Sequence, residues 1–156
     1  MTSAGRGLPT AAAIAVAALV LAGCSGGDDE PDLSAAPGGG TPACAALVAR
    51  VPGTVLDRAR STPQAAGVAA WGDPPIVLRC GVDAPAGPTS DPCLAVDGVD
   101  WLFENPDAAD EPASFLSYGR TPAVRVTVPG AREDASGALV DLAPALAPLP
   151  AAEHCQ

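Results

Sequence analysis

CLAVDGVDWLF, residues 93–103, is the stretch that most directly indicates the fold of this chain. In it, Asp97-Gly98 separates two short runs of apolar, β-branched and aromatic residues. A two-residue type I′ turn needs positive φ at both central positions, and an Asp-Gly pair accepts this geometry. The stretch therefore predicts an antiparallel β-hairpin that turns at Asp97 and Gly98.

Further extended segments are expected on both sides of this hairpin. Toward the carboxyl terminus, residues 123–128 alternate apolar and polar side chains, as a half-buried strand does. They are expected to pair with residues 114–118. Toward the amino terminus, residues 66–72 and 75–82 form two more short extended runs.

Apolar residues at helical spacing are found near both ends of the domain. Residues 44–51 carry such a stripe, which ends before Pro52, and a second short helix is expected over residues 55–60. Residues 138–146 carry another stripe, with Ser136 as its candidate N-cap. The pattern predicts a small single domain of the α+β class, with an antiparallel sheet of about five strands and an N-terminal and a C-terminal helix.

The amino terminus has the pattern of an export signal. Arg6 precedes an apolar run, residues 11–22, and small residues stand directly before Cys24. A charged start, an apolar stretch and small residues before the cut are typical of a secretory signal peptide. The run is shorter than the roughly 20 residues that span a bilayer, which disfavours a transmembrane helix.

Leu21-Ala22-Gly23-Cys24 resembles the lipobox of bacterial lipoproteins. The resemblance implies that residues 1–23 are removed by cleavage between Gly23 and Cys24. It also implies that the thiol of Cys24 carries a diacylglyceryl group. The expected location is then the cell membrane, with the protein anchored by lipid on the extracytoplasmic face.

The composition excludes one class of partner and indicates the organisation of the chain. The chain has 8 basic residues, all arginine, against 18 acidic ones, a net charge of −10. Nucleic-acid binding needs a basic surface and is not expected. Residues 24–43 are rich in glycine, proline and acids, so we expect a flexible tether there and a folded domain over residues 44–156. The absence of lysine and the abundance of alanine, glycine, proline and arginine are typical of a GC-rich bacterium such as an actinomycete.

Four cysteines remain once Cys24 is assigned to the lipid. Four allow three pairings, and the sequence does not choose among them. We favour Cys80–Cys93, which closes a short loop, and Cys44–Cys155, which joins the two ends of the domain. The rival interpretation is a metal site, but no CxxC pair occurs and His154 is the single histidine, so no metal is expected.

One run of the sequence resembles a known family. Residues 70–82, AWGDPPIVLRCGV, are similar to the central signature of the actinobacterial domain-of-unknown-function family 3515, whose members are short exported proteins or lipoproteins. Residues 99–101 and 118–124 resemble its second and third signatures. The resemblance implies export and a single domain. It carries no activity, cofactor or catalytic residue with it.

Large polar and aromatic side chains near these signatures form the candidate binding site. If they converge at one edge of the sheet, their aromatic rings can stack on a ligand, and their guanidinium groups can bind a carboxylate or phosphate bidentately. The alternative is that they are structural, with Arg79–Asp100 or Arg120–Asp73 as salt bridges and the tryptophans in the core. The candidates are Trp71, Asp73, Arg79, Asp100, Trp101, Tyr118 and Arg120.

Two classes of function remain open. The first is a non-catalytic module that binds an envelope protein or a cell-wall ligand. The second is a small acid-catalysed hydrolase of wall polysaccharide, which would need Asp73 and Asp100 about 5–9 Å apart across a cleft. His154 is expected to be an exposed tail residue.

Overall fold

The computed structural model describes residues 1–2, 31–62, 65–85 and 89–156. The predicted lipobox and its cleavage site, Gly23 and Cys24, lie outside these residues. Two helices and eight strands form one α+β domain within the described part. The helices are α1 (Pro42–Arg50) and α2 (Arg132–Leu146), and the strands are β1 (Thr54–Val55), β2 (Arg58–Ser61), β3 (Val68–Trp71), β4 (Ile76–Cys80), β5 (Cys93–Val96), β6 (Val99–Phe103), β7 (Ala113–Ser117) and β8 (Val124–Val128).

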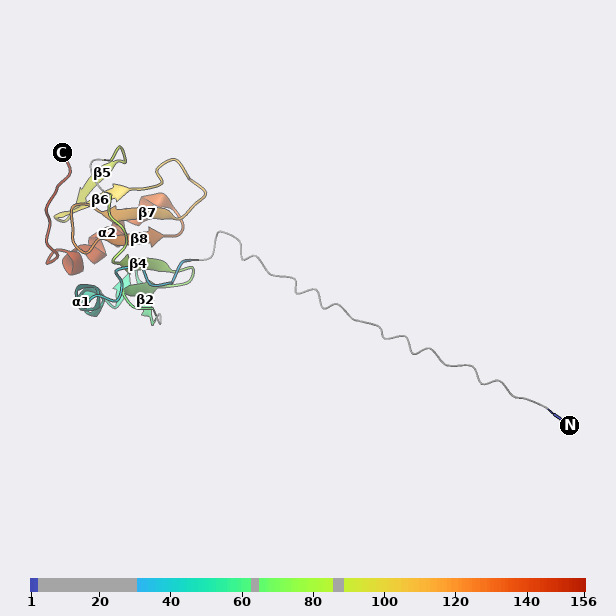
Figure 1. The fold of residues 1–156 in the computed structure, drawn as a ribbon. Helices are drawn as coiled ribbons and strands as arrows, with labels where there is room; N and C mark the ends of the chain where they lie inside the picture. The colour runs from blue at the N-terminus through green and yellow to red at the C-terminus, as the bar shows by residue number, and fades with distance from the viewer. Residues whose placement is uncertain (3–30, 63–64, 86–88) are drawn as a thin grey trace.

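All eight strands belong to one antiparallel sheet, with the order β1-β2-β3-β4-β8-β7-β6-β5. Each half of the chain makes a four-stranded meander, and the two meanders join where the last strand of each, β4 and β8, pair (Figure 1). The junction is therefore built from residues about 50 positions apart in the sequence, such as Leu78 and Val126.

The hairpin predicted from residues 93–103 is confirmed. Strands β5 and β6 pair directly across Asp97 and Gly98, whose φ angles are 46° and 77°. Both angles lie in the left-handed region that the type I′ turn requires. The alternation in residues 123–128 is also confirmed, because Val124, Val126 and Val128 are buried and the residues between them are half-buried.

The expected number of about five strands is wrong, and so is the short helix over residues 55–60. These residues instead form the hairpin β1–β2, which turns at Leu56 and Asp57 with φ angles of 47° and 58°. The segment is too short for apolar spacing to distinguish a helical turn from an edge hairpin. Residues 58–61 form a strand and not a helix because they pair with β3 at the edge of the sheet.

The two faces of the sheet differ in what covers them. Side chains of one face pack under α1 and α2 and form the main core, which includes Trp71, Leu78, Trp101 and Val126. The opposite face, called here the open face, is covered by neither of the two helices in the described residues. It carries a small apolar cluster around Leu102 and Leu116, and Ala36 of the amino-terminal segment covers part of it.

The helices form largely where the apolar stripes predict them. Thr41 caps α1 by accepting a hydrogen bond from Cys44 N at 3.4 Å. Ser136 does not cap α2, which begins four residues earlier and has Ala131 at its N-cap without a side-chain bond. Pro144 is accommodated inside α2. Within the described residues, no helix is both long and apolar enough to cross a membrane.

All four predicted cysteines form disulfides, but the favoured pairing is wrong. The bonds are Cys44–Cys80 and Cys93–Cys155, with Cα–Cα distances of 5.5 and 5.7 Å. Cys80 faces the helices, whereas Cys93 stands beside Leu102 on the open face. Four interstrand spacings separate β4 from β5, on the order of 19 Å, so a short loop in sequence does not bring these two cysteines together.

The folded part begins earlier than the expected boundary at Cys44. Ala36 is 4% exposed, and Gly38 N donates a hydrogen bond to Gly81 O at 2.8 Å. Gly81 has a φ of 79°, and a Cβ there would lie 2.2 Å from the carbonyl carbon of Gly38. This close approach of two backbones fixes residues 36–41 against the end of β4.

Candidate functional site

The seven predicted binding residues do not converge on one site. Trp71 and Trp101 are fully buried in the core beneath the helices, and the Trp71 indole Nε1 donates to Pro52 O at 3.0 Å. Asp73 is exposed in the β3–β4 turn. The two tryptophans are therefore structural, which is the alternative that the sequence left open.

Arg120 is also structural. Its side chain is buried at the carboxyl end of α2, where Nη1 donates to Leu149 O at 2.7 Å and more weakly to Leu146 O and Ala147 O. Nη2 donates to Gly98 O at 2.6 Å. Carbonyls at the end of a helix lack partners within the helix and carry partial negative charge, so a guanidinium suits this position. Arg120 joins α2 to the β5–β6 turn.

Asp73 and Asp100 are not brought together as a carboxylate pair. Asp73 precedes β4, and Asp100 lies in β6, three strand spacings further along the sheet, on the order of 14 Å. They also lie at opposite ends of the sheet, because Asp100 pairs near the β5–β6 turn, Asp73 lies in the β3–β4 turn, and β4 and β6 run in opposite directions. Neither predicted salt bridge, Arg79–Asp100 or Arg120–Asp73, is formed in the described residues.

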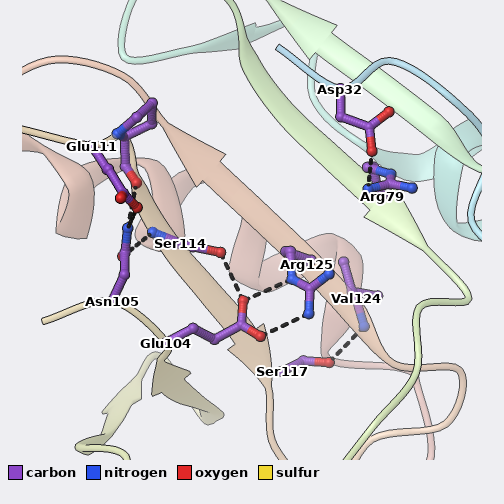
Figure 2. A network of polar contacts seen from close by, with 10 residues as sticks. Asp32, Arg79, Glu104, Asn105, Glu111, Ser114, Ser117, Val124 and Arg125 are labelled. Carbon is purple, nitrogen blue, oxygen red and sulfur yellow. Dashed lines mark hydrogen bonds and ion pairs between the residues drawn. The ribbon is translucent and has the colours of Figure 1, made fainter. Parts of the chain in front are cut away.

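Arg79 lies on the open face and belongs to a network of charged groups (Figure 2). Its Nη1 lies 2.5 Å from Asp32 Oδ2, and its Nε donates to Ser34 O at 3.1 Å. Directly opposite on β8, Arg125 makes a two-pronged ion pair with Glu104, with both N–O distances at 2.7 Å. The network leaves neither guanidinium without a carboxylate.

Glu104 is the most constrained acid of this network. Burial alone would raise its pKa, but hydrogen bonds from Arg125 and Ser114 together with the Arg125 charge hold the pKa below the ordinary glutamate value. Ser114 Oγ donates to Glu104 Oε2 at 2.7 Å. Glu104 is thus a fixed anion that keeps Arg125 in place.

The other two candidates, Asp100 and Tyr118, lie beside a cavity at the carboxyl-terminal tail. Tyr118 lines this cavity, whose volume is about 400 Å³, and Tyr118 N donates to Asp100 O at 2.7 Å. Volumes of 300 to 1,000 Å³ are usual for small-molecule sites. The wall consists of Thr89, Asp91, Cys93, Leu102, Tyr118, His154, Cys155 and Gln156.

His154 is the residue that the sequence analysis set aside. Its side chain is 67% exposed, as expected for a tail residue, yet its Nδ1 lies 2.8 Å from Asp100 Oδ2. The Asp100 side chain is only 12% exposed, and its contact with Nδ1 orients the imidazole ring. A carboxylate that binds one ring nitrogen leaves the other directed away from it.

Three contacts fix the tail that carries His154. The Cys93–Cys155 disulfide attaches it to β5, and Ala152 N donates to Gly119 O at 2.8 Å. Gly119 has a φ of 65°, and a Cβ there would lie 2.2 Å from Glu153 O, so only glycine allows the tail to lie this close. The tail side of the cavity is consequently held in place by contacts within the domain.

Tyr118 is also held from the tail side. A hydrogen bond with the Glu153 carboxylate is the main cause that raises the pKa of the Tyr118 phenol above its ordinary value, with burial and the Glu153 charge adding to it. A second hollow of about 420 Å³ lies on the Glu153 side and shares Tyr118, His154 and Gln156 with the cavity. The two hollows are therefore neighbours, and these three residues line both of them.

The residues around the tail cavity favour a polar ligand that is uncharged or cationic. Asp91, Asp100 and Glu153 stand around it, and an anion would meet these charges. Within the ranges that the structure describes, no three His, Cys, Asp or Glu side chains are grouped so as to hold a metal ion. The sequence carried one signal for the site, the position of His154 beside a cysteine, but not the long-range contact with Asp100.

Comparison with known proteins gives one match. The family model described as "Protein of unknown function (DUF3515)" matches residues 8–154. No curated protein and no solved structure matches the chain.

Proposed function

This chain belongs to the DUF3515 family of proteins of unknown function, and on that premise we propose that it is a lipid-anchored binding protein of the bacterial cell envelope. Cys24, released as the new amino terminus by cleavage after Gly23, carries the lipid. The domain then stands on the extracytoplasmic face of the plasma membrane. Two disulfides within the domain support this location, because such bonds persist in oxidising compartments.

The tail cavity is the proposed binding site, and one observation carries the proposal. Asp100 holds His154 at the rim of a cavity of about 400 Å³ whose tail wall is attached by a disulfide. Such preorganisation reduces the entropy that binding must overcome. A structural tail would not require a polar hollow of this size beside it.

The wall chemistry favours a neutral, hydroxyl-rich ligand such as a saccharide of the cell wall. Tyr118 offers a half-exposed ring with a polar end, which can pack against a sugar face and bond to a hydroxyl. Asp91, Thr89 and Gln156 add side-chain acceptors and donors around it. The acidic surroundings disfavour phosphate and carboxylate ligands.

Binding can be tested by proton NMR without resonance assignment of the whole protein. The chain has one tyrosine and one histidine, so each gives one set of aromatic signals. We expect N-acetylglucosamine oligosaccharides to shift the signals of Tyr118 and His154 in a saturable way. His154→Ala is expected to weaken binding at least tenfold, while Val140→Ala, on the exposed side of α2, leaves it unchanged. Unmoved tyrosine and histidine signals at millimolar oligosaccharide would overturn the saccharide proposal.

The anchor is tested separately. The intact mass of the membrane-bound protein is expected to correspond to residues 24–156 plus a diacylglyceryl group. Cys24→Ala is expected to abolish both the added mass and the membrane fractionation, and Ser25→Ala to change neither. A Cys24→Ala protein that still carries lipid would refute the anchor.

The Asp100–His154 pair favours a second candidate, hydrolysis of wall polysaccharide. A histidine oriented by a carboxylate can act as a general base toward water. Purified protein would then release new reducing ends from wall polysaccharide, and His154→Ala would stop the release. If the wild-type protein releases none over a long incubation, the binding proposal stands without this alternative.

A further inference from the structure

Residues 31–36, called here the strap, lie on the open face of the sheet, and we propose that the strap is a releasable dock for the tether. The Arg79 side chain is the receptor and Asp32 the ligand. When docked, the strap shortens the connection between the lipid anchor and the domain. This inference rests on the proposed lipid anchor at Cys24.

The path of the strap is defined at both ends. Pro31 and Asp32 border a cavity of about 260 Å³ together with Pro74 and Pro75, before the start of β4. At the other end, Gly38 is bonded to Gly81, just after β4. The strap therefore runs over β4 on the open face, in the same direction as that strand. Asp32 lies at the Arg79 side chain (Figure 2).

The polar contacts of the strap centre on one guanidinium. Arg79 binds the Asp32 carboxylate through Nη1 and the Ser34 carbonyl through Nε. Ser34 in turn donates to Asp32 Oδ1 from its hydroxyl at 2.6 Å and its amide at 2.9 Å. These Ser34 bonds, with the Arg79 charge, hold the pKa of Asp32 below its ordinary value, so the ligand stays ionised.

The dock is built to be reversible. The Asp32 side chain is 56% exposed, whereas Arg79 is only 18% exposed beneath it. An ion pair with one partner in water contributes little and weakens as salt is added. The strap residues before Ala36 are all exposed. Ala36 is buried, and Gly38 bonds to Gly81, so the chain from Ala36 onward stays attached to the domain when the earlier residues leave.

Release changes the reach of the anchor. Pro31 lies seven residues after Cys24, a span of at most about 25 Å, whereas Ala36 lies twelve residues after Cys24, a span of at most about 42 Å. The point of attachment also moves along β4, from the Pro75 end to the Gly81 end. Docking thus holds the domain close to the membrane, and release lets it reach about 1.7 times as far.

The receptor has a reason to hold an acid. Arg79 lies opposite Arg125, and an Arg79 without a carboxylate would face this like charge. Glu104 already pairs with Arg125 and is not free to pair with Arg79 as well. The strap supplies the second carboxylate. Any exposed carboxylate at high local concentration could compete with Asp32 for the same guanidinium.

The docking step is tested on unlipidated protein, so that it does not depend on the anchor. In nitrogen-15 NMR, we expect the Arg79 Nε–H signal to be protected from exchange with water and Asp32→Ala to increase its exchange at least tenfold. Asp134→Ala removes an exposed acid from α2 and serves as the charge-matched control. Equal exchange in the wild type and Asp32→Ala would overturn the dock itself.

The reach is tested on lipidated protein in liposomes, by energy transfer from Trp71 and Trp101 to a dansyl lipid. We expect Asp32→Ala and Arg79→Asp each to lower the transfer, and the exchanged pair Asp32→Arg with Arg79→Asp to restore it. High salt should lower transfer in the wild type and leave Asp32→Ala unchanged. If transfer is the same in the wild type and both single variants, the strap does not set the distance. Absence of lipid on the protein would instead refute the anchor and leave the first measurement valid.

Discussion

Arg79 of β4 and Arg125 of β8 lie directly opposite each other at the junction of the two meanders. Like charges facing one another across a sheet are destabilising. Each guanidinium has its own carboxylate, Asp32 for Arg79 and Glu104 for Arg125, and the two acids lie far apart in the sequence. Each acid therefore offsets the repulsion between the two arginines at this junction while it is ionised and in place.

Replacing Glu104 by glutamine is expected to destabilise the protein by about 2 kcal/mol at neutral pH, because a charged hydrogen-bond partner of Arg125 and Ser114 is lost. The folded-state pKa of Glu104 lies below the ordinary value of 4.5. Its stabilisation is therefore complete above that value and is lost as the pH falls through the lowered pKa. Urea unfolding of wild type and Glu104→Gln should show a difference that shrinks on acidification.

The control for this series is Glu133→Gln, which alters an exposed acid in the first turn of α2. It is expected to change stability by no more than about 0.5 kcal/mol. A Glu104→Gln effect that stays constant across the acid range would show that the carboxylate charge is not the source of the stabilisation.

Arg120→Ala is expected to cost at least about 3 kcal/mol, since the carbonyls of Gly98, Leu146 and Leu149 lose their donor inside the protein. Arg120→Lys should recover part of the loss, because an ammonium cannot reach carbonyls on two sides at once. Arg58→Ala is the matched control, as Arg58 makes one exposed bond to Pro74 O. Thermal unfolding measures all three, and equal losses for Arg120→Ala and Arg58→Ala would contradict the capping role.

Peptide mapping of the unreduced protein should yield the linkages Cys44–Cys80 and Cys93–Cys155. In the loop-entropy description, each bond contributes about 4 kcal/mol. Replacing both Cys93 and Cys155 by alanine should also free the tail, so that the His154 signals become those of an unstructured histidine. The Cys44, Cys80 double replacement should leave the His154 signals in place. A Cys80–Cys93 peptide in the digest would refute the arrangement of the two faces.

The single tyrosine permits a direct test of the tail contact. Because a hydrogen bond with Glu153 raises the pKa of Tyr118, the ultraviolet titration of the phenol should have its midpoint above the ordinary value of 10.0. Glu153→Gln removes the carboxylate and should move the midpoint down toward that value. Glu133→Gln, on α2, should not move it. An unchanged midpoint in Glu153→Gln would show that the Glu153 carboxylate does not bond to Tyr118.

Local geometry was readable from the sequence, because it depends on residues close together in the chain. Asp97-Gly98 specified its own turn, Val124 to Val128 alternated as a half-buried strand, and α1 formed over its apolar stripe. The hairpin at Leu56 and Asp57 escaped prediction, since a strand of two residues is too short to show a period. The presence of two disulfides was predictable from the number of cysteines and the predicted export signal.

Only the tertiary structure decided which groups meet. The order of strands separates Cys80 from Cys93, and the alternation of faces turns one toward the helices and the other away. The same two facts bury Trp71 and Trp101, assign Arg120 to the end of α2 and bring His154 to Asp100, 54 positions away. Contacts of this kind depend on how the two meanders join through β4 and β8, and no local pattern in the chain carries that information.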